Sequence, residues 1–210
     1  MSLFVDVISD VICPWCYIGK RRLEKAIAAH GATVKVRWLP FQLNPTMPKE
    51  GISRREYRTK KFGSWEWSQE LDAKVIEVGK DEGIDFAFDR IERTPNTLDA
   101  HRLIWLADKE GVQAAVVEAL FLAYFTEGQD ISNQRVLIDV VAGAGLDRSK
   151  AEAVLKGDEG MVAIKEAGEL SQRHRVDGVP FFVVNGEITL AGAQQPDAFL
   201  EAFDRAGGNN

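Results

Sequence analysis

The order of apolar and polar positions predicts a strand, a helix and a second strand at the start of the chain. Residues 3–9 form an apolar run interrupted by one acid, as in a buried strand. Apolar and polar side chains alternate over residues 33–39, which predicts the second strand. Between them we expect an amphipathic helix from Pro14 to His30, with Gly31 as a left-handed C-cap. These elements predict a βαβ unit with parallel strands, whose functional sites lie at the carboxyl edge of the sheet.

The cationic residues of this first helix are expected to form its solvent-exposed face. They follow the helix start by one turn or more, away from the positive end of the helix dipole. They are Lys20, Arg21, Arg22 and Lys25.

From residue 40 to about 175 the pattern is helical, and no strand is predicted with assurance. Turn signals separate the expected helices, which are 53–62, 64–81, 96–110, 112–126, 133–142, 148–156 and 159–175. Several begin at residues that cap helices, namely Ser53, Ser64, Asn96 and Asn133. The run Phe86–Phe88 is the one segment expected to be extended.

Strands return at the end of the chain as a hairpin. Residues 181–184 and 187–190 flank Asn185-Gly186, a pair that supplies the positive φ angles of a type I′ turn. A last helix is expected at 195–205, and residues 207–210 are expected to be a disordered tail.

Composition and charge exclude several classes of function. The chain has 210 residues, 45% of them hydrophobic, and a net charge of −6, which argues against a general nucleic-acid binder. No apolar run approaches the roughly 18 residues of a membrane span, so no membrane partner is expected. No targeting segment precedes the first strand, which predicts a cytoplasmic protein unless a leader was removed.

Both cysteines of the protein lie in one motif, Cys13-Pro14-Trp15-Cys16. Pro14 is favoured at the first helical position, which makes Cys13 the N-cap and places Cys16 one turn further on the same face. We expect the Cys13 sulfur to accept hydrogen bonds from the N–H groups of Trp15 and Cys16, with the helix dipole favouring its thiolate. Cys13 is then the attacking thiolate, and Cys16 resolves the mixed disulfide.

The cysteines allow two other interpretations. Two cysteines do not complete a four-ligand zinc site, and no zinc-finger spacing links them to the histidines, so no metal is expected. The histidines are His30, His101 and His174. A pair of inert thiols is the remaining alternative, and a C-x-x-C between a strand and a helix argues against it.

These features together resemble the DsbA-like thioredoxin fold, specifically the FrnE branch, which is related to 2-hydroxychromene-2-carboxylate isomerases and kappa-class glutathione transferases. The resemblance covers nearly the whole chain and rests on SDVICPWC, FQLNP, NTLDAHRL and VDGVPFF, at residues 9–16, 41–45, 96–103 and 176–182. It implies an α/β, thioredoxin-like fold with a large all-helical insertion. Residues 1–40 plus 176–206 would form the thioredoxin-like domain and 41–175 the insertion.

The resemblance also implies that the Val179–Pro180 peptide bond is cis and lies beside Cys13. The Val179 main chain would then face outward and pair with an extended substrate segment, as an added strand does. An ordinary proline at the start of a strand is the alternative. Thioredoxins and several relatives carry a buried acid on the first strand, at the position where this chain has Val7. Asp10 is the nearer acid that could tune the thiols, although a solvated turn residue is the more common role for an acid at a strand end.

Other site residues are expected at the rim. Trp15 should be exposed there, where with Pro14 it can receive an apolar substrate segment. Asn96 is first a helix cap and secondarily a substrate contact, and for His101 a structural role is favoured over a catalytic one. The basic run 53–61 is expected to be a solvated helix face, with binding of acidic ligands as the alternative.

The sequence thus predicts a cytoplasmic thiol–disulfide oxidoreductase that reduces or isomerises protein disulfides. The expected partner is a disulfide-containing protein or a small thiol; no cofactor is expected, although glutathione could act as co-substrate, and the oligomeric state stays open. A glutathione-dependent isomerase is the first alternative, with the γ-glutamyl carboxylate near Gln194 and Gln195, but such relatives typically have serine where Cys13 stands. A non-catalytic holdase or partner-binding module is the second.

Overall fold

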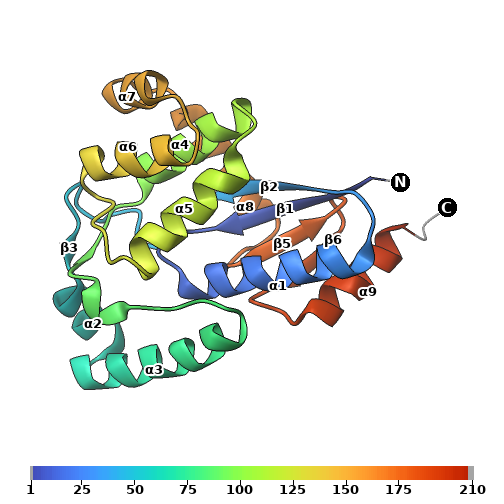
Figure 1. Cartoon of the computed structure of the whole chain (residues 1–210), viewed down its shortest axis with the longest axis horizontal. Helices are drawn as coiled ribbons and strands as arrows, with labels where there is room; N and C mark the ends of the chain where they lie inside the picture. The colour runs from blue at the N-terminus through green and yellow to red at the C-terminus, as the bar shows by residue number, and fades with distance from the viewer. Residues whose placement is uncertain (1, 208–210) are drawn as a thin grey trace.

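The computed structural model describes residues 2–207 and places the long strands in one four-stranded sheet (Figure 1). Its order is β2-β1-β5-β6, with β1 parallel to β2 and antiparallel to β5. β1 has a neighbour on either side, and Val7 lies opposite Trp38 on one side and Phe182 on the other. Its residues Leu3, Val5, Val7 and Ile8 are buried, whereas Phe4 is 38% exposed. The strands are β1 (Leu3–Ser9), β2 (Val34–Pro40), β5 (Phe181–Val184) and β6 (Ile188–Ala191).

The first and last helices lie side by side along the sheet. α1 (Pro14–His30) is the crossover between β1 and β2 and ends at Gly31, whose φ of 73° is the left-handed C-cap expected from the sequence. α9 (Pro196–Gly207) packs against α1 and buries Phe199 and Phe203 (Figure 1). Gly207 is therefore helical and not part of a tail; the rest of the predicted tail lies outside the described residues.

The segment between β2 and β5 is mainly helical, as predicted. Each expected helix is present with both ends within two residues of the prediction. They are α2 (Arg54–Phe62), α3 (Trp65–Asp81), α4 (Leu98–Lys109), α5 (Gln113–Phe125), α6 (Gln134–Gly143), α7 (Arg148–Lys156) and α8 (Met161–Arg173). The caps predicted at Ser53, Ser64 and Asn133 each accept a backbone N–H of the following turn.

The insertion is not all-helical, which corrects the prediction. β3 (Ile52–Ser53) pairs antiparallel with β4 (Arg93–Thr94) and so closes the α2–α3 segment at its base. Strands of two residues are too short to show a periodicity of two, so the pattern could not reveal them. The segment expected to be extended instead leads into a 3-10 turn, Phe88–Arg90.

An aromatic cluster joins α1 to the inserted helices. Tyr17 of α1 stacks on Phe121 of α5 with ring centroids 4.9 Å apart. Phe86 meets the Tyr17 ring edge-on, and Phe125 lies stacked beside it. Because all four rings are buried, the hydrophobic core runs without a break from the sheet into the insertion.

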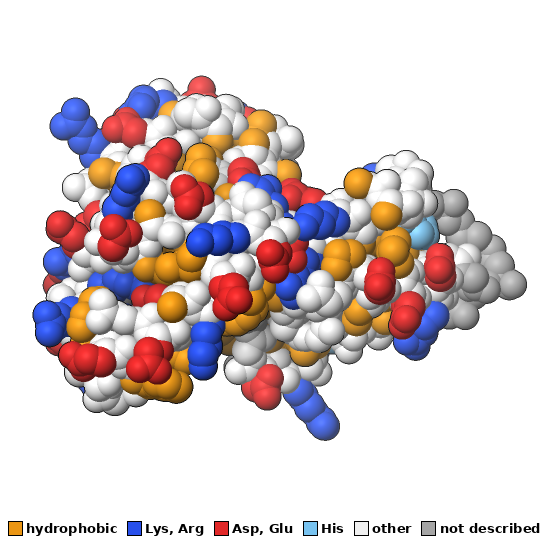
Figure 2. Space-filling view, turned by 60° about the horizontal axis from the view of Figure 1, so that its bottom comes forward, with side chains coloured by type: hydrophobic (Ala, Val, Ile, Leu, Met, Phe, Trp, Pro, Cys, Tyr) orange, Lys and Arg blue, Asp and Glu red, His pale blue; other side chains and the backbone are white. Residues whose placement is uncertain are grey.

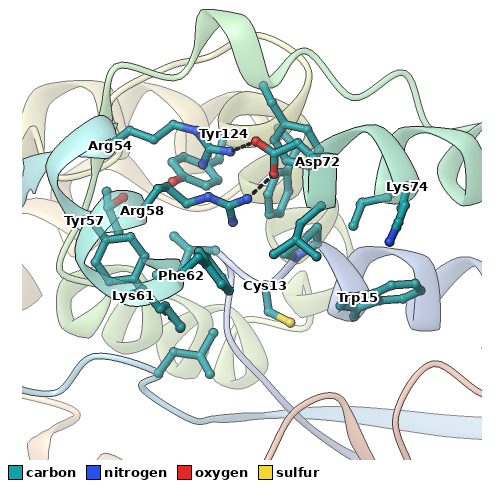
Figure 3. Close-up of a pocket in the computed structure, with 18 residues that line it drawn as sticks. Cys13, Trp15, Arg54, Tyr57, Arg58, Lys61, Phe62, Asp72, Lys74 and Tyr124 are labelled. Carbon is teal, nitrogen blue, oxygen red and sulfur yellow. Dashed lines mark hydrogen bonds and ion pairs between the residues drawn. The ribbon is translucent and has the colours of Figure 1, made fainter. Parts of the chain in front are cut away.

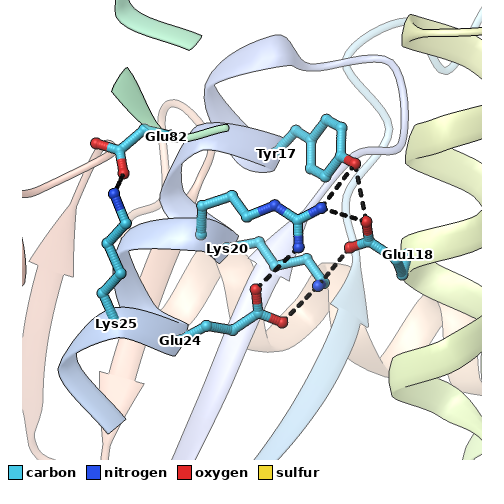
Figure 4. Close-up of polar contacts among 7 residues, drawn as sticks. Tyr17, Lys20, Glu24, Lys25, Glu82 and Glu118 are labelled. Atoms are coloured by element: carbon cyan, nitrogen blue, oxygen red, sulfur yellow. Dashed lines mark hydrogen bonds and ion pairs between the residues drawn. The ribbon is translucent and has the colours of Figure 1, made fainter. Parts of the chain in front are cut away.

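The cationic residues of α1 form a solvent face only in part, because Lys20 and Arg22 are buried, contrary to expectation. Lys20 is buried, and its ammonium lies between Glu24 and Glu118 of α5 (Figure 4). Glu118 also accepts hydrogen bonds from Arg21 and from the Tyr17 hydroxyl. Burial alone would raise the pKa of the Glu118 carboxyl, but the bond from Lys20 and the neighbouring charges outweigh it and hold that pKa below its ordinary range.

A second ion pair fastens α1 to the end of α3. Arg22 donates to Glu82 at 2.6 Å and to the carbonyl of Ala193, and Lys25 donates to the other Glu82 oxygen at 2.6 Å. Arg22 and Glu82 are both buried, whereas the Lys25 side chain is half exposed. The charges of α1 therefore hold the insertion against the sheet layer.

The outer edge of β2 is occupied by a side chain. The Gln113 amide accepts the N–H of Trp38 at 2.9 Å and donates to the Trp38 carbonyl at 3.0 Å. This pair of bonds is the one that a neighbouring strand would make.

The face shown in Figure 2 carries acidic and basic side chains interspersed, with small hydrophobic areas between them. Within residues 2–207, no helix combines the length and the apolar character that crossing a bilayer requires.

Candidate active site

Cys13 occupies the turn between β1 and α1. It is the N-cap of α1, with extended backbone angles, and Pro14 is the first helical residue, as predicted. The predicted hydrogen bonds to the Cys13 sulfur are absent, because no N–H of the first turn is bonded to it. The sulfur instead donates to the carbonyl of Val179 at 3.5 Å. The Val179–Pro180 bond is cis and lies beside Cys13, as the resemblance implies.

The main-chain carbonyl of Val179 is thus turned toward Cys13. In this position it orients the thiol, and a substrate strand that paired with this carbonyl would have to displace the sulfur from it.

Cys16 lies behind Cys13 and is fully buried, and both cysteines are in the thiol form. Burial raises the pKa of the Cys16 thiol well above its ordinary value, and the neighbouring Cys13 raises it further. Cys13 is 6% exposed as a residue and lines the adjoining cavity, whereas Cys16 has no exposed surface and does not line it. The pair therefore has one accessible and one enclosed thiol.

Asp10 is buried and is not a solvated turn residue, which corrects the favoured expectation. One carboxylate oxygen accepts the N–H of Leu43 at 2.8 Å, and the other lies 3.3 Å from Nε2 of His101. His101 is also buried, and the same nitrogen lies 3.1 Å from the carbonyl of Phe41. The two side chains thus tie the loop after β2 to α4, next to the turn that carries Cys13.

The remaining predicted residues fall into two groups. Trp15 is 40% exposed and lies with Pro14 on the wall of a cavity beside Cys13. Asn96 lies away from that cavity: its side chain accepts the Leu98 N–H at 2.9 Å at the start of α4 and donates to the carbonyl of Met47. It performs the helix-start role, although the N-cap itself is the following residue.

The cavity beside Cys13 has a volume of about 410 Å³, within the range of small-molecule pockets. One wall is the start of α1, and the others come from α2, α3 and α5 (Figure 3). Sequence reasoning missed these outer walls. The signal was present in the basic run of α2, where Tyr57 and Phe62 accompany the cations, but nothing local showed that this helix folds over Cys13.

The polar lining of the cavity is cationic. Arg54 and Arg58 both donate to Asp72, at 2.7 and 2.5 Å. Lys61 and Lys74 lie on opposite sides of Cys13 in Figure 3. Arg54 is buried, so the basic run of α2 is not simply a solvated face, as had been expected.

Comparison with known proteins places this architecture in a family. A model of the DSBA-like thioredoxin domain matches residues 4–204, nearly the whole chain. The chain is 27% identical over 207 residues to the uncharacterized protein YwbO of Bacillus subtilis (strain 168), with 97% of this chain and 96% of that protein covered.

Solved structures agree with this placement. A probable DsbA oxidoreductase from Streptomyces coelicolor superposes with a TM-score of 0.92 at 30% identity, over 99% of this chain and 91% of that one. A 2-hydroxychromene-2-carboxylate isomerase (TM-score 0.74, 21% identity, 96% and 95% covered) shares the fold. The cytosolic disulfide reductase DsbM from Pseudomonas aeruginosa also shares the fold, with a TM-score of 0.67 at 21% identity over 96% of this chain and 98% of that one.

Proposed function

The chain belongs to the DSBA-like thioredoxin domain family, and we propose that it is a thiol–disulfide oxidoreductase whose reactive pair is Cys13 and Cys16. The observation that carries the proposal is the asymmetry of the pair at the N-terminus of α1. Cys13 opens onto a cavity, whereas Cys16 is enclosed directly behind it and burial raises the pKa of its thiol. A thiol pair with one accessible member is the arrangement that two-step disulfide exchange requires.

The reaction begins with the thiolate of Cys13, which attacks one sulfur of a substrate disulfide. The substrate S–S bond breaks, its electron pair leaves with the other sulfur, and a mixed disulfide with Cys13 remains. Cys16 then loses its proton and attacks the Cys13 sulfur, which releases the second substrate thiol. Because the Cys16 thiol is held neutral by burial, it does not compete with Cys13 for the first attack.

The proposed direction is reduction or isomerisation in a reducing cytoplasm, with a small thiol such as glutathione returning the pair to the dithiol. Two similarities support this direction: the fold is shared with a protein named as a cytosolic disulfide reductase, and one structure of that protein contains glutathione.

The test is a redox titration of the purified protein against a glutathione series, with the state of the cysteines read by thiol trapping and mass. We expect one reversible dithiol–disulfide transition, which disappears in Cys13→Ser. A potential near about −270 mV would indicate a reductase, and one above about −200 mV an oxidase or isomerase. Absence of any transition, with glutathione bound non-covalently, would refute the oxidoreductase and favour the isomerase.

A further inference from the structure

The cavity beside Cys13 differs in charge from the rest of the molecule. The chain as a whole has a net charge of −6. The charged side chains that line the cavity are nevertheless four cations and one carboxylate: Arg54, Arg58, Lys61, Lys74 and Asp72. The excess of positive charge is therefore local, and it lies in a cavity that Cys13 lines.

Part of this charge is already neutralised. Asp72 is shared by Arg54 and Arg58, so this buried group of three carries one net positive charge. Burial lowers the pKa of the Arg58 guanidinium, although nearby Asp72 acts in the opposite direction. The group ties α2 to α3 at the wall of the cavity.

The two lysines have no such partner. Lys61 donates to the Tyr57 hydroxyl at 2.7 Å and lies over the Tyr57 ring, while Lys74 lies over the ring of Trp67. Within residues 2–207, neither ammonium is in salt-bridge distance of a carboxylate. Cations at the mouth of a concave site attract and orient anions.

Between the lysines the walls are apolar and mostly aromatic. The lining includes Phe62, Phe88, Tyr124, Phe125 and Val75. The Tyr124 hydroxyl is turned away to the Arg93 carbonyl, and burial raises the pKa of Tyr124 to about 12, so this ring presents an uncharged face. A flat apolar ligand fits such walls.

We propose that this cavity is the substrate site for a small thiol or disulfide with an aromatic body and a carboxylate, its sulfur at Cys13 and its carboxylate at Lys61 or Lys74. The proposal rests on the proposed function, and it narrows the substrate class. The enclosure of Cys13 supports a small substrate, because a cysteine that is only 6% exposed and lines a cavity is reached more readily by a small molecule than by a disulfide in a folded protein.

The exchange balances without a further reactant. The dithiol protein and one aryl disulfide give the Cys13–Cys16 disulfide and two aryl thiols, so the protein loses the two electrons that the substrate gains. One turnover of the reduced protein therefore suffices for the test.

The first measurement compares two aromatic disulfides, anionic dithiobis(nitrobenzoate) and uncharged dithiodipyridine. Their stopped-flow rates with the reduced protein are divided by their rates with 2-mercaptoethanol, a thiol without other charged groups, to remove intrinsic reactivity. We expect the normalised rate to favour the anionic disulfide, and to do so less at high salt.

Variants of the two lysines show whether the preference for the anionic disulfide comes from the cavity. The double variant Lys61→Met/Lys74→Met should react about tenfold more slowly with the anionic disulfide and within about twofold of wild type with the neutral one. Lys60→Met/Lys80→Met is the matched control, since it removes the same charge from the same two helices at exposed residues outside the cavity lining. If both double variants change the two rates alike, the effect is bulk charge and the proposal is wrong.

A binding measurement separates this proposal from the oxidoreductase itself. In calorimetry, naphthoate should bind both the wild type and the Cys13→Ser variant. The uncharged naphthamide should bind the wild type much more weakly, and naphthoate should bind the Lys61→Met/Lys74→Met variant much more weakly. Redox exchange without naphthoate binding would overturn the substrate class and leave the function intact. Binding without any redox exchange would overturn the function.

Discussion

Removing the ion pair between Arg22 and Glu82 should show how firmly α3, one wall of the cavity, is held against the helix that carries the cysteines. The change is made as a cycle: Arg22→Met, Glu82→Met and the double variant. Both side chains are buried, with 9% and 6% exposed, and 2.6 Å separates Nε of Arg22 from Oε1 of Glu82.

The magnitude follows from which charge is left unpaired. Glu82→Met leaves the buried Arg22 guanidinium with only the Ala193 carbonyl, and breaking a buried pair in this way costs about 3–5 kcal/mol. Arg22→Met should cost less, because Lys25 still bonds Glu82. The double variant replaces both charges with apolar groups, so its free energy of unfolding should lie within about 1–2 kcal/mol of that of the wild type.

The assay is urea unfolding at neutral pH, followed by tryptophan fluorescence. Against a total stability of about 5–15 kcal/mol, the Glu82→Met loss is large and should move the midpoint clearly. Single-variant losses below about 1 kcal/mol, or a double-variant loss equal to their sum, would refute the assignment of a buried, coupled pair.

The same cycle has a predicted pH dependence. Burial by itself would raise the pKa of Glu82, but the hydrogen bonds from Lys25 and Arg22 outweigh it and hold the pKa below its ordinary value of 4.5. A carboxyl whose pKa is depressed on folding stabilises the protein above the unfolded-state pKa and loses that contribution as pH falls through the folded-state pKa. The difference in free energy of unfolding between wild type and Glu82→Met should therefore be constant near neutrality and shrink below pH 4.5.

Two further predictions concern the environment of the cysteines. Gly19→Ala would place a Cβ 3.0 Å from Cγ of Pro180, so thermal denaturation should show a loss of stability of about 1–3 kcal/mol. The control is Gly168→Ala on α8, which has open space around it and should be neutral or stabilising; equal effects of the two changes would contradict the packing argument. Iodoacetamide at neutral pH should modify Cys13 well before Cys16, because burial keeps the Cys16 thiol neutral and raises its pKa well above 9.0; peptide mass mapping that found equal labelling would contradict this.

The parts of the fold that were predictable are those encoded within a few residues. Pro14 in the first helical position fixes where α1 begins, and it fixed Cys13 as the N-cap. Asn185 and Gly186 have φ angles of 48° and 79°, the positive values that their sequence predicts for the hairpin. Local chemistry of this kind needs no knowledge of the rest of the chain.

The parts that were not predictable depend on partners far along the chain. Lys20 looks like a surface lysine until Glu118, 98 residues later, is folded against it. Asp10 was expected in solvent because its neighbours His101 and Leu43 belong to segments whose position no pattern revealed. The same is true of Lys61, whose place at the cavity follows from how the α2–α3 pair folds back over α1.

The Gln113 side chain on β2 has a consequence for how copies of this protein can associate. An uncovered edge strand is a template on which another chain can add, and such addition leads to strand exchange and aggregation. At β2 both backbone polar groups of Trp38 are bonded to the amide of Gln113, so growth of the sheet from that side is blocked at Trp38. β6 is the opposite edge strand of the four-stranded sheet, so edge-to-edge association of this sheet should favour β6 over β2.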